Sequence, residues 1–265
     1  MNKIYCRAYQ AVFRLAANFM NWSVPVVYQG ENAIKDIGKI ILENNLAPIM
    51  LVTDKGITAT DIYPKIIDVL EKANISYTVF SETVVNPTIT NVETALTQYQ
   101  KNGCQGILAI GGGSPLDCAK GLAARIARPK KSLSKMRGEL KVGKKTPVVI
   151  AVPTTAGTGS ETTIAAVITD PDTHEKYAIN DMVLIPKYAV LDPLLTIGLP
   201  PHITSTTGVD ALTHAVEAYV GHSNTKDTKL LAEKACKLIF ENLYTAYSDG
   251  KNISARENMQ TASFY

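Results

Sequence analysis

The stretch Ile110-Gly-Gly-Gly-Ser-Pro-Leu-Asp-Cys-Ala-Lys120 decides the fold class, because it links an apolar run to a helical pattern through three glycines. The residues just before the glycines, Gly106 to Ile110, predict a buried strand. Ser114 and Pro115 predict that the helix begins there, since Ser is a favoured N-cap and Pro a favoured first helical residue. Asp117 is placed to support this cap. A strand that turns directly into a helix is the repeating unit of a parallel α/β sheet.

The same alternation extends on both sides of this unit. None of the apolar runs alternates with polar residues, as expected for strands that helices cover on both faces. Strands are predicted at 48–53, 76–80, 106–110 and 148–152, and helices at 63–73, 92–102 and 115–127. The N-terminal segment 5–20 is predicted to be an amphipathic helix that packs on this α/β body.

The pattern changes after Pro200-Pro201, where long helical patterns at 207–220 and 228–247 follow each other without a strand. A domain boundary near residue 200 is therefore predicted, with an α/β domain over 1–199 and the first part of a helical domain over 200–265. The final stretch, 258–265, reads as a helix without a stop signal. We expect the chain to be the front part of a larger, C-terminally truncated protein.

Composition excludes several classes of protein. With 265 residues and 46% hydrophobic content, the chain is long enough to bury a large core. A net charge of +3 does not indicate a nucleic-acid-binding protein. The basic cluster at 128–145 is predicted to be a surface loop. No apolar stretch is long enough to span a membrane. The cysteines lack metal-binding spacing and predict reduced thiols in a cytoplasmic protein: Cys6, Cys104, Cys118 and Cys236.

Two glycine-containing loops are candidates for binding phosphate. Glycines let a ligand approach the backbone, and the free N–H groups of a helix N-terminus attract phosphate oxygens, as expected for Gly111 to Ser114. The alternative is a turn that needs glycine only for packing. The second loop, Pro153-Thr-Thr-Ala-Gly-Thr-Gly-Ser-Glu-Thr-Thr163, follows the strand at 148–152. Two such loops at one edge of a parallel sheet favour a dinucleotide.

Asp54 follows the strand at 48–53, where a carboxylate can accept hydrogen bonds from an adenosine ribose. Such an acid would repel a 2′-phosphate and therefore favours NAD over NADP. The alternative is a simple turn, because Asp54-Lys55-Gly56 is also a good turn sequence.

Asp210 and His214 are four residues apart in a helical pattern, so both side chains project from one helix face. They could supply two ligands to a divalent metal ion, although on spacing alone a structural pair remains the alternative. The other histidines, His174, His202 and His222, are predicted to lie at the surface or near helix ends.

Four motifs in this order resemble those of the iron-containing (group III) alcohol dehydrogenases, over about residues 24–265. The motifs are Asn86-Pro-Thr88, Gly111-Gly-Gly-Ser-Pro115, Pro153-Thr-Thr-Ala-Gly-Thr-Gly-Ser-Glu161 and Gly208-Val-Asp-Ala-Leu-Thr-His214. The resemblance implies a Rossmann-like N-terminal domain and an all-helical C-terminal domain, the dehydroquinate synthase-like architecture, with the active site between them.

The resemblance also implies roles for individual residues. Asp210 and His214 match two metal ligands, and the remaining ligands would be histidines beyond Tyr265. The residues that match cofactor contacts are Asp54, Asn86, Gly112, Gly113, Ser114, Asp117, Thr154, Thr155, Thr158, Thr163 and Lys176.

For the full-length protein, the resemblance implies NAD, Fe²⁺ with Zn²⁺ as a possible replacement, and hydride transfer between NAD and a small primary alcohol or aldehyde. A homodimer is also expected by resemblance. No side chain stands out as a general base, and no catalytic residue is identified beyond the metal ligands. Because half the metal ligands are missing, we expect this chain to be poorly active. One rival is the zinc-dependent glycerol dehydrogenase branch, which the motif from Gly208 to His214 disfavours. The other is a non-catalytic nucleotide-binding or interaction protein with the same fold.

Overall fold

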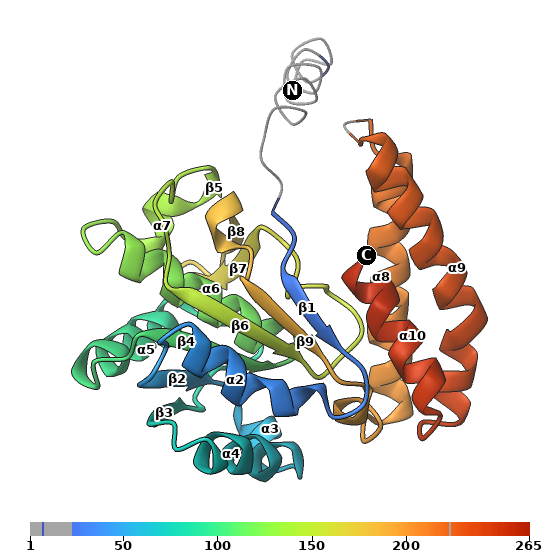
Figure 1. Cartoon of the computed structure of the whole chain (residues 1–265). Coiled ribbons are helices and arrows are strands. Elements are labelled where there is room, and N and C mark those ends of the chain that lie inside the picture. The colour runs from blue at the N-terminus through green and yellow to red at the C-terminus, as the bar shows by residue number, and fades with distance from the viewer. Residues whose placement is uncertain (1–6, 8–22, 223) are drawn as a thin grey trace.

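A six-stranded sheet forms the centre of the molecule (Figure 1). The computed structural model describes residue 7, residues 23–222 and residues 224–265, so the predicted helix over 5–20 lies, apart from Arg7, outside the described residues. Every strand pair of this sheet is parallel, which confirms the α/β prediction. In spatial order the strands are β1 (Val26–Gln29), β9 (Tyr188–Leu191), β6 (Val148–Pro153), β4 (Gly106–Gly111), β2 (Ile49–Val52) and β3 (Tyr77–Phe80).

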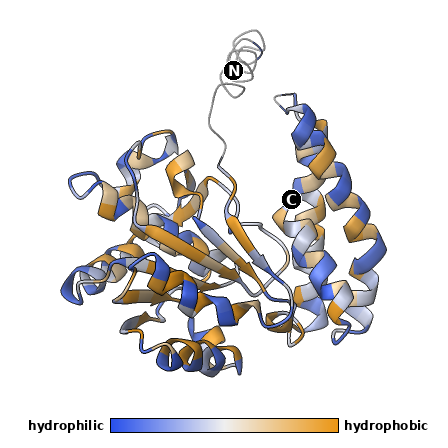
Figure 2. Ribbon diagram, in the orientation of Figure 1, coloured by the Kyte–Doolittle hydropathy of each residue, from blue (hydrophilic) through white to orange (hydrophobic). Residues whose placement is uncertain are grey.

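Helices cover both faces of the sheet, because its central strands are apolar on both sides. In β2, Met50 packs into the core that contains α5 (Ile89–Lys101) and α6 (Gly113–Ala127). Its neighbour Ile49 packs into the opposite core, with α2 (Asp36–Glu43) and α4 (Ile62–Lys72). Figure 2 shows the resulting concentration of hydrophobic residues along the strands. The absence of alternation in the sequence was therefore a correct sign of burial on both faces.

A second, three-stranded sheet was not predicted. It has the order β5 (Gly138–Glu139), β8 (Lys176–Asn180) and β7 (Ala165–Thr169), and β7 and β8 are antiparallel. The prediction of a surface loop over 128–145 is wrong in part, since this stretch contains β5 and α7 (Leu133–Met136). Leu133, Met136 and Val142 are fully buried and hold the stretch against the α/β core. Short turns of helix occur elsewhere in the described chain: α3 (Lys55–Thr58), η1 (Ala33–Lys35), η2 (Met182–Leu184) and η3 (Pro193–Leu195).

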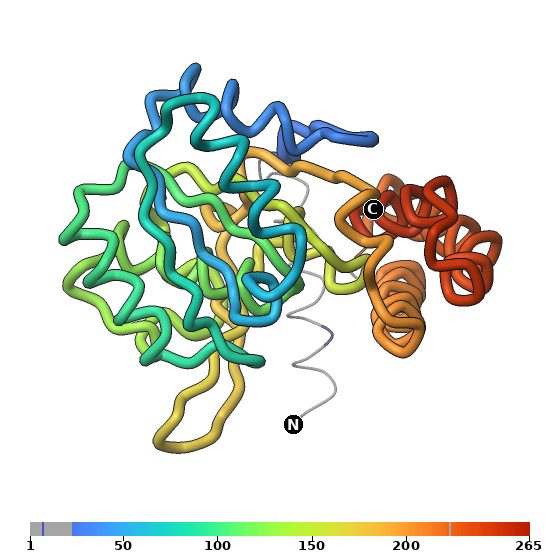
Figure 3. The backbone as a smooth tube through the Cα atoms, turned by 90° about the horizontal axis from the view of Figure 1, so that it is seen from below, coloured from blue at the N-terminus to red at the C-terminus, as the bar shows by residue number. Residues whose placement is uncertain are grey.

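Three helices follow the sheet and lie together beside it (Figure 3). They are α8 (Pro201–Val220), α9 (Lys226–Ser248) and α10 (Ile253–Phe264). Helix α8 begins at Pro201 rather than at the predicted residue 207, because proline is well suited to the first helical position. In the described part of the chain, no helix combines the length and the apolar character needed to cross a membrane.

Hydrogen bonds join the helices to the sheet region. The Gln260 side-chain amide donates to the Pro153 carbonyl at 3.3 Å, at the end of β6. The Gln29 amide, on β1, donates to the Thr261 hydroxyl at 2.7 Å. The helices share a core of small residues that also receives Ala156 from the loop after β6. The division into two domains at residue 200 stays a prediction.

The cysteine residues within the described ranges are free: Cys104, Cys118 and Cys236. Burial raises the pKa of the Cys118 thiol to about 12, so this group stays protonated and unreactive at neutral pH.

Candidate functional site

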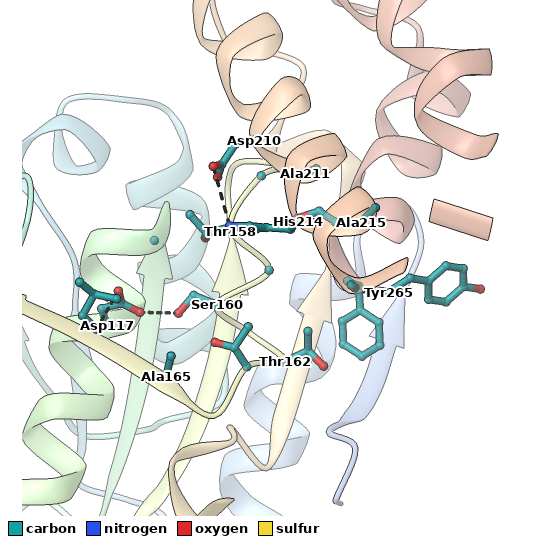
Figure 4. A pocket seen from close by; sticks show the side chains of 18 of the residues that line it. Asp117, Thr158, Ser160, Thr162, Ala165, Asp210, Ala211, His214, Ala215 and Tyr265 are labelled. Atoms are coloured by element: carbon teal, nitrogen blue, oxygen red, sulfur yellow. Dashed lines mark hydrogen bonds and ion pairs between the residues drawn. The ribbon is translucent and has the colours of Figure 1, made fainter. Parts of the chain in front are cut away.

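One cavity of about 640 Å³ joins the two glycine-containing loops to the Asp210–His214 pair. It lies where the N-terminus of α6, the segment after β6, strands β7 and β8, and helices α8 to α10 meet. Figure 4 shows Asp210 and His214 on α8, facing the loop that carries Thr158 and Ser160. The predicted site residues that line the cavity are Asn86, Gly113, Ser114, Asp117, Thr158, Thr163, Lys176, Asp210 and His214.

Helix α6 begins differently from the prediction. Its N-cap is Gly112, and no side chain bonds the cap, so the predicted roles of Ser114 and Asp117 in capping are wrong. The Ser114 hydroxyl instead accepts a hydrogen bond from the Asn86 backbone N–H at 3.3 Å. The reason is that Ser114 lies inside the first turn and faces the loop after β3. A helix start without a side-chain cap leaves N–H groups available to an anion.

Asp117 ties the second loop to α6. Its Oδ1 accepts from the Ser160 hydroxyl at 2.7 Å, and its Oδ2 accepts from the Val167 N–H at 3.2 Å. Burial raises the pKa of this carboxyl, although the charge of Lys120 opposes the shift. Asp117 therefore lines the cavity and also fixes its wall.

The two glycine-containing loops pack directly against each other. The Thr154 N–H donates to the Gly111 carbonyl at 2.9 Å, which extends the pairing of β6 with β4. A Cβ built on Gly112 would approach the Thr155 Oγ1 to 3.4 Å, and one built on Gly113 would approach the Thr158 Oγ1 to 3.0 Å. Thr154, Thr155 and Gly112 are not among the residues that line the cavity. They support the residues that do.

Asn86 and Lys176 meet at the cavity from segments that are far apart in sequence. The Lys176 ammonium, at the start of β8, donates to the Asn86 Oδ1 at 2.8 Å. Asn86 has a φ of 57°, in the left-handed region that asparagine tolerates better than most residues. Because Lys176 keeps further N–H groups, it can still reach an anionic ligand in the cavity.

Asp54 lies at the carboxyl edge of the sheet but outside the set of residues that line the cavity. Its Oδ1 accepts from the Ile57 N–H at 2.8 Å and caps α3. The simple turn that was the alternative is therefore a short helix. A role of Asp54 towards a ribose stays a prediction.

Asp210 and His214 share one face of α8, with 3.9 Å between the aspartate Oδ1 and the histidine Nε2. Their side chains are 43% and 52% exposed, so both have room to turn towards a shared ion. No group of three or more His, Cys, Asp and Glu side chains converges in a metal-binding arrangement within the described ranges. A role of the pair as metal ligands therefore stays a prediction.

Two buried charged residues were not identified as part of the site from the sequence: Lys120 on α6 and Glu161 in the loop after β6. They are 1% and 3% exposed. Burial lowers the pKa of Lys120 to about 8 and raises that of Glu161 to about 7. Lys120 follows Asp117 by three residues within the small, apolar run Cys118-Ala-Lys-Gly-Leu-Ala-Ala124. A lysine within such a run on a helix is the sequence signal that could have identified it.

The buried Glu161 carboxyl predicts a pH-dependent stability. Its pKa rises from 4.5 to about 7, so the folded protein holds a proton that the unfolded chain releases. Stability from this group is present below pH 4.5 and is lost as the pH rises through about 7. The Glu161→Gln variant should therefore lose less stability between pH 5 and 7 than the unsubstituted protein, as measured by urea denaturation. Glu43→Gln, at an exposed position of α2, is the matched control, and parallel pH profiles for all three proteins would contradict this prediction.

Comparison with known proteins gives matches over nearly the whole chain. A family model described as "Iron-containing alcohol dehydrogenase" matches residues 25–193. A second, "Fe-containing alcohol dehydrogenase family, C-terminal", matches residues 204–265. Alcohol dehydrogenase 4 of Schizosaccharomyces pombe is 38% identical over 235 residues, which cover 89% of this chain and 56% of that protein.

Solved structures show the same similarity. The crystal structure of a 1,3-propanediol oxidoreductase matches with a TM-score of 0.89 and 38% identity, covering 92% of this chain and 64% of that one. The sulfoacetaldehyde reductase from Bifidobacterium kashiwanohense, solved in complex with NAD⁺, matches with a TM-score of 0.83 and 32% identity, covering 92% and 65%. The chain thus spans between 56% and 65% of the length of these three relatives.

Proposed function

Because the chain belongs to the iron-containing alcohol dehydrogenase family, we propose that its cavity binds NAD and presents it to an alcohol or aldehyde beside Asp210 and His214. The reaction is reversible hydride transfer between the nicotinamide ring and a small primary alcohol or aldehyde. One observation carries this proposal: a single cavity is lined both by the predicted phosphate-binding loop and by the predicted metal ligands.

The phosphates of NAD are proposed to lie at the N-terminus of α6. Gly113 and Ser114 supply backbone N–H groups there, and Gly112 lets the chain turn without a side chain in the way. Lys176, with Asn86, adds a positive charge on the β8 side of the cavity. Thr158 and Thr163 supply hydroxyl groups from the segment after β6.

A preference for NAD over NADP is proposed to come from Asp54. This carboxylate uses Oδ1 to cap α3, which leaves Oδ2 for the ribose hydroxyls of a cofactor that extends along the sheet edge. A complex with NAD⁺ is known for the similar sulfoacetaldehyde reductase. The adenosine end would then lie beyond the cavity that holds the nicotinamide end.

Asp210 and His214 are proposed to hold a divalent metal, Fe²⁺ with Zn²⁺ as a possible replacement. A carboxylate oxygen and an imidazole nitrogen suit either ion. When bound, such an ion acts as a Lewis acid on the substrate oxygen and lowers the pKa of the alcohol. Small side chains line the same cavity and leave space for a small substrate: Ala211, Ala215, Ala218, Ala232, Ala235 and Ala262.

The described residues supply two ligands, and water would fill the rest of the coordination sphere. We therefore expect weak metal binding and slow turnover from this chain. Zinc should bind with a free energy of about 8 kcal/mol or less, in the micromolar range or weaker. A complete structural zinc site gives about 10–16 kcal/mol.

Competition with a chromogenic zinc indicator measures this affinity directly. Asp210→Asn should reduce zinc binding to background, whereas Glu43→Gln, which removes an exposed carboxylate on α2, should not. Tight binding of one zinc per chain that survives Asp210→Asn would reject the proposed metal site. The rival function, a nucleotide-binding protein without catalysis, predicts NAD binding with neither specific metal binding nor turnover of alcohols.

A further inference from the structure

Lys120 is almost completely buried, at 1% exposure, and lies behind the cavity wall rather than in the cavity. Its ammonium group donates to three oxygen atoms of the segment after β6. These are the Thr163 carbonyl at 3.0 Å, the Thr163 Oγ1 at 2.9 Å and the Ala165 carbonyl at 2.9 Å. Three acceptors use all three N–H groups of a protonated lysine.

Asp117, one turn earlier on α6, holds the same segment from the same helix face. It accepts from the Ser160 hydroxyl and from the Val167 N–H, on either side of the Lys120 contacts. The segment is thereby fixed to α6 along its length from 160 to 167. Ser160, Thr163, Ala165 and Val167 all line the cavity, so α6 sets the shape of that wall.

The three oxygen atoms that accept hydrogen bonds from the Lys120 ammonium are uncharged. No ion pair within 4.0 Å joins Lys120 to a carboxylate of the described residues, and the nearby charges of Asp117 and Glu161 only partly offset its burial. An apolar side chain of similar length would cost less to bury. Lys120 is therefore not explained by a contribution to the stability of the fold. Its role lies in the hydrogen bonds that it makes to the cavity wall.

The contact with Thr163 has a direct chemical consequence. Because the Thr163 Oγ1 accepts from Lys120, its own hydroxyl hydrogen is free to point elsewhere. Thr163 lines the cavity, and the carbonyls at 163 and 165 each accept one hydrogen bond from Lys120. The hydroxyl is thus held as a hydrogen-bond donor towards a ligand.

We infer that Lys120 is a positioning residue that holds the Thr163 hydroxyl as a donor to the carboxamide oxygen of the nicotinamide. The inference rests on the proposed function, since it requires the nicotinamide end of NAD to lie at this wall. A carboxamide oxygen is the acceptor on that end of the cofactor which suits a fixed hydroxyl donor. ADP-ribose has the same adenosine, phosphates and sugars but lacks this group, so Lys120 should matter for NAD⁺ and not for ADP-ribose.

The test compares the affinities of NAD⁺ and ADP-ribose by calorimetry. Lys120→Met alone would leave Glu161 buried without its neighbouring positive charge, so the main variant is Lys120→Met/Glu161→Gln. We expect it to bind NAD⁺ at least about tenfold more weakly, a loss of about 1.4 kcal/mol, with ADP-ribose affinity within about twofold of the unsubstituted protein. Lys101→Met, at an exposed position of α5, is the control for loss of a lysine and should change neither affinity.

A second pair of variants tests the same inference even if Lys120→Met/Glu161→Gln does not fold. Thr163→Val removes the hydroxyl and should cause the same selective loss for NAD⁺, whereas Thr163→Ser should retain the affinity. Equal losses for both ligands, or no loss for either, would overturn the inference while leaving the nucleotide site intact. If the unsubstituted chain binds neither ligand, the proposed function fails, and this inference fails with it.

Discussion

Gly113→Val should weaken NAD⁺ binding by at least about 100-fold, a loss of about 2.7 kcal/mol. A Cβ at this position would already lie 3.0 Å from the Thr158 Oγ1 and Cγ2, and the added methyl groups of valine would fill the remaining gap. Because Gly113 is the first residue of α6, this gap is also where a phosphate must approach the free N–H groups of the helix. Isothermal titration calorimetry with NAD⁺ gives the affinity, and circular dichroism shows whether the variant is folded.

Gly198→Val is the matched control for this prediction. A Cβ at Gly198 would meet nothing within 4 Å, so valine should be accepted there and NAD⁺ affinity should stay within about twofold. If Gly113→Val is folded and binds NAD⁺ as well as this control does, the phosphates do not lie at the N-terminus of α6.

Gly159→Ala should lower the free energy of unfolding by about 2–4 kcal/mol. Gly159 has a φ of +59°, and a Cβ there would lie 2.5 Å from the backbone oxygen of Ser263 on α10. Both the left-handed backbone and the clash act against alanine, and backbone atoms cannot move aside as a flexible side chain can. Since the loop after β6 and α10 form one corner of the cavity, the substitution should also weaken NAD⁺ binding.

Gly103→Ala separates the two causes. Gly103 has nearly the same φ, +61°, but a Cβ there would meet nothing within 4 Å. Gly103→Ala should therefore lower the free energy of unfolding by only the cost of the backbone strain, about 1–2 kcal/mol. Urea denaturation of both variants measures the difference. Equal losses would show that the contact between Gly159 and Ser263 does not contribute to stability.

The central strands that lie in long apolar runs could be predicted from the sequence, although β9, which is buried along its whole length, was not predicted. Strands β2, β4 and β6 are apolar throughout because helices cover both of their faces, and their βα units follow from this pattern. Strand β1 was not predicted, because it is an edge strand whose Val26 and Val27 are exposed. Strands β7 and β8 contain threonine, lysine and asparagine, and tertiary pairing rather than local hydrophobicity makes them strands.

The candidate site shows a similar division. The glycine-containing loops and the Asp210–His214 pair could be identified by spacing and chemistry, and they lie on one cavity. The contacts of Ser114 and Asp117 could not be predicted, because they depend on the loop after β3 and on β7, which come together only in the fold. Lys120 was missed for a physical reason too, since a lysine normally signals exposure, and its burial depends on oxygens from residues 163 and 165.

Calorimetric titration of the 265-residue chain with NAD⁺, with and without Zn²⁺, shows whether this cavity is a dinucleotide site. We expect one NAD⁺ site per chain that is present without the metal, and we expect its affinity to be greatly weakened in Gly113→Val but not in Gly198→Val. Absence of saturable NAD⁺ binding by the folded chain, or binding that is unchanged in Gly113→Val, would contradict the assignment of this cavity as the dinucleotide site.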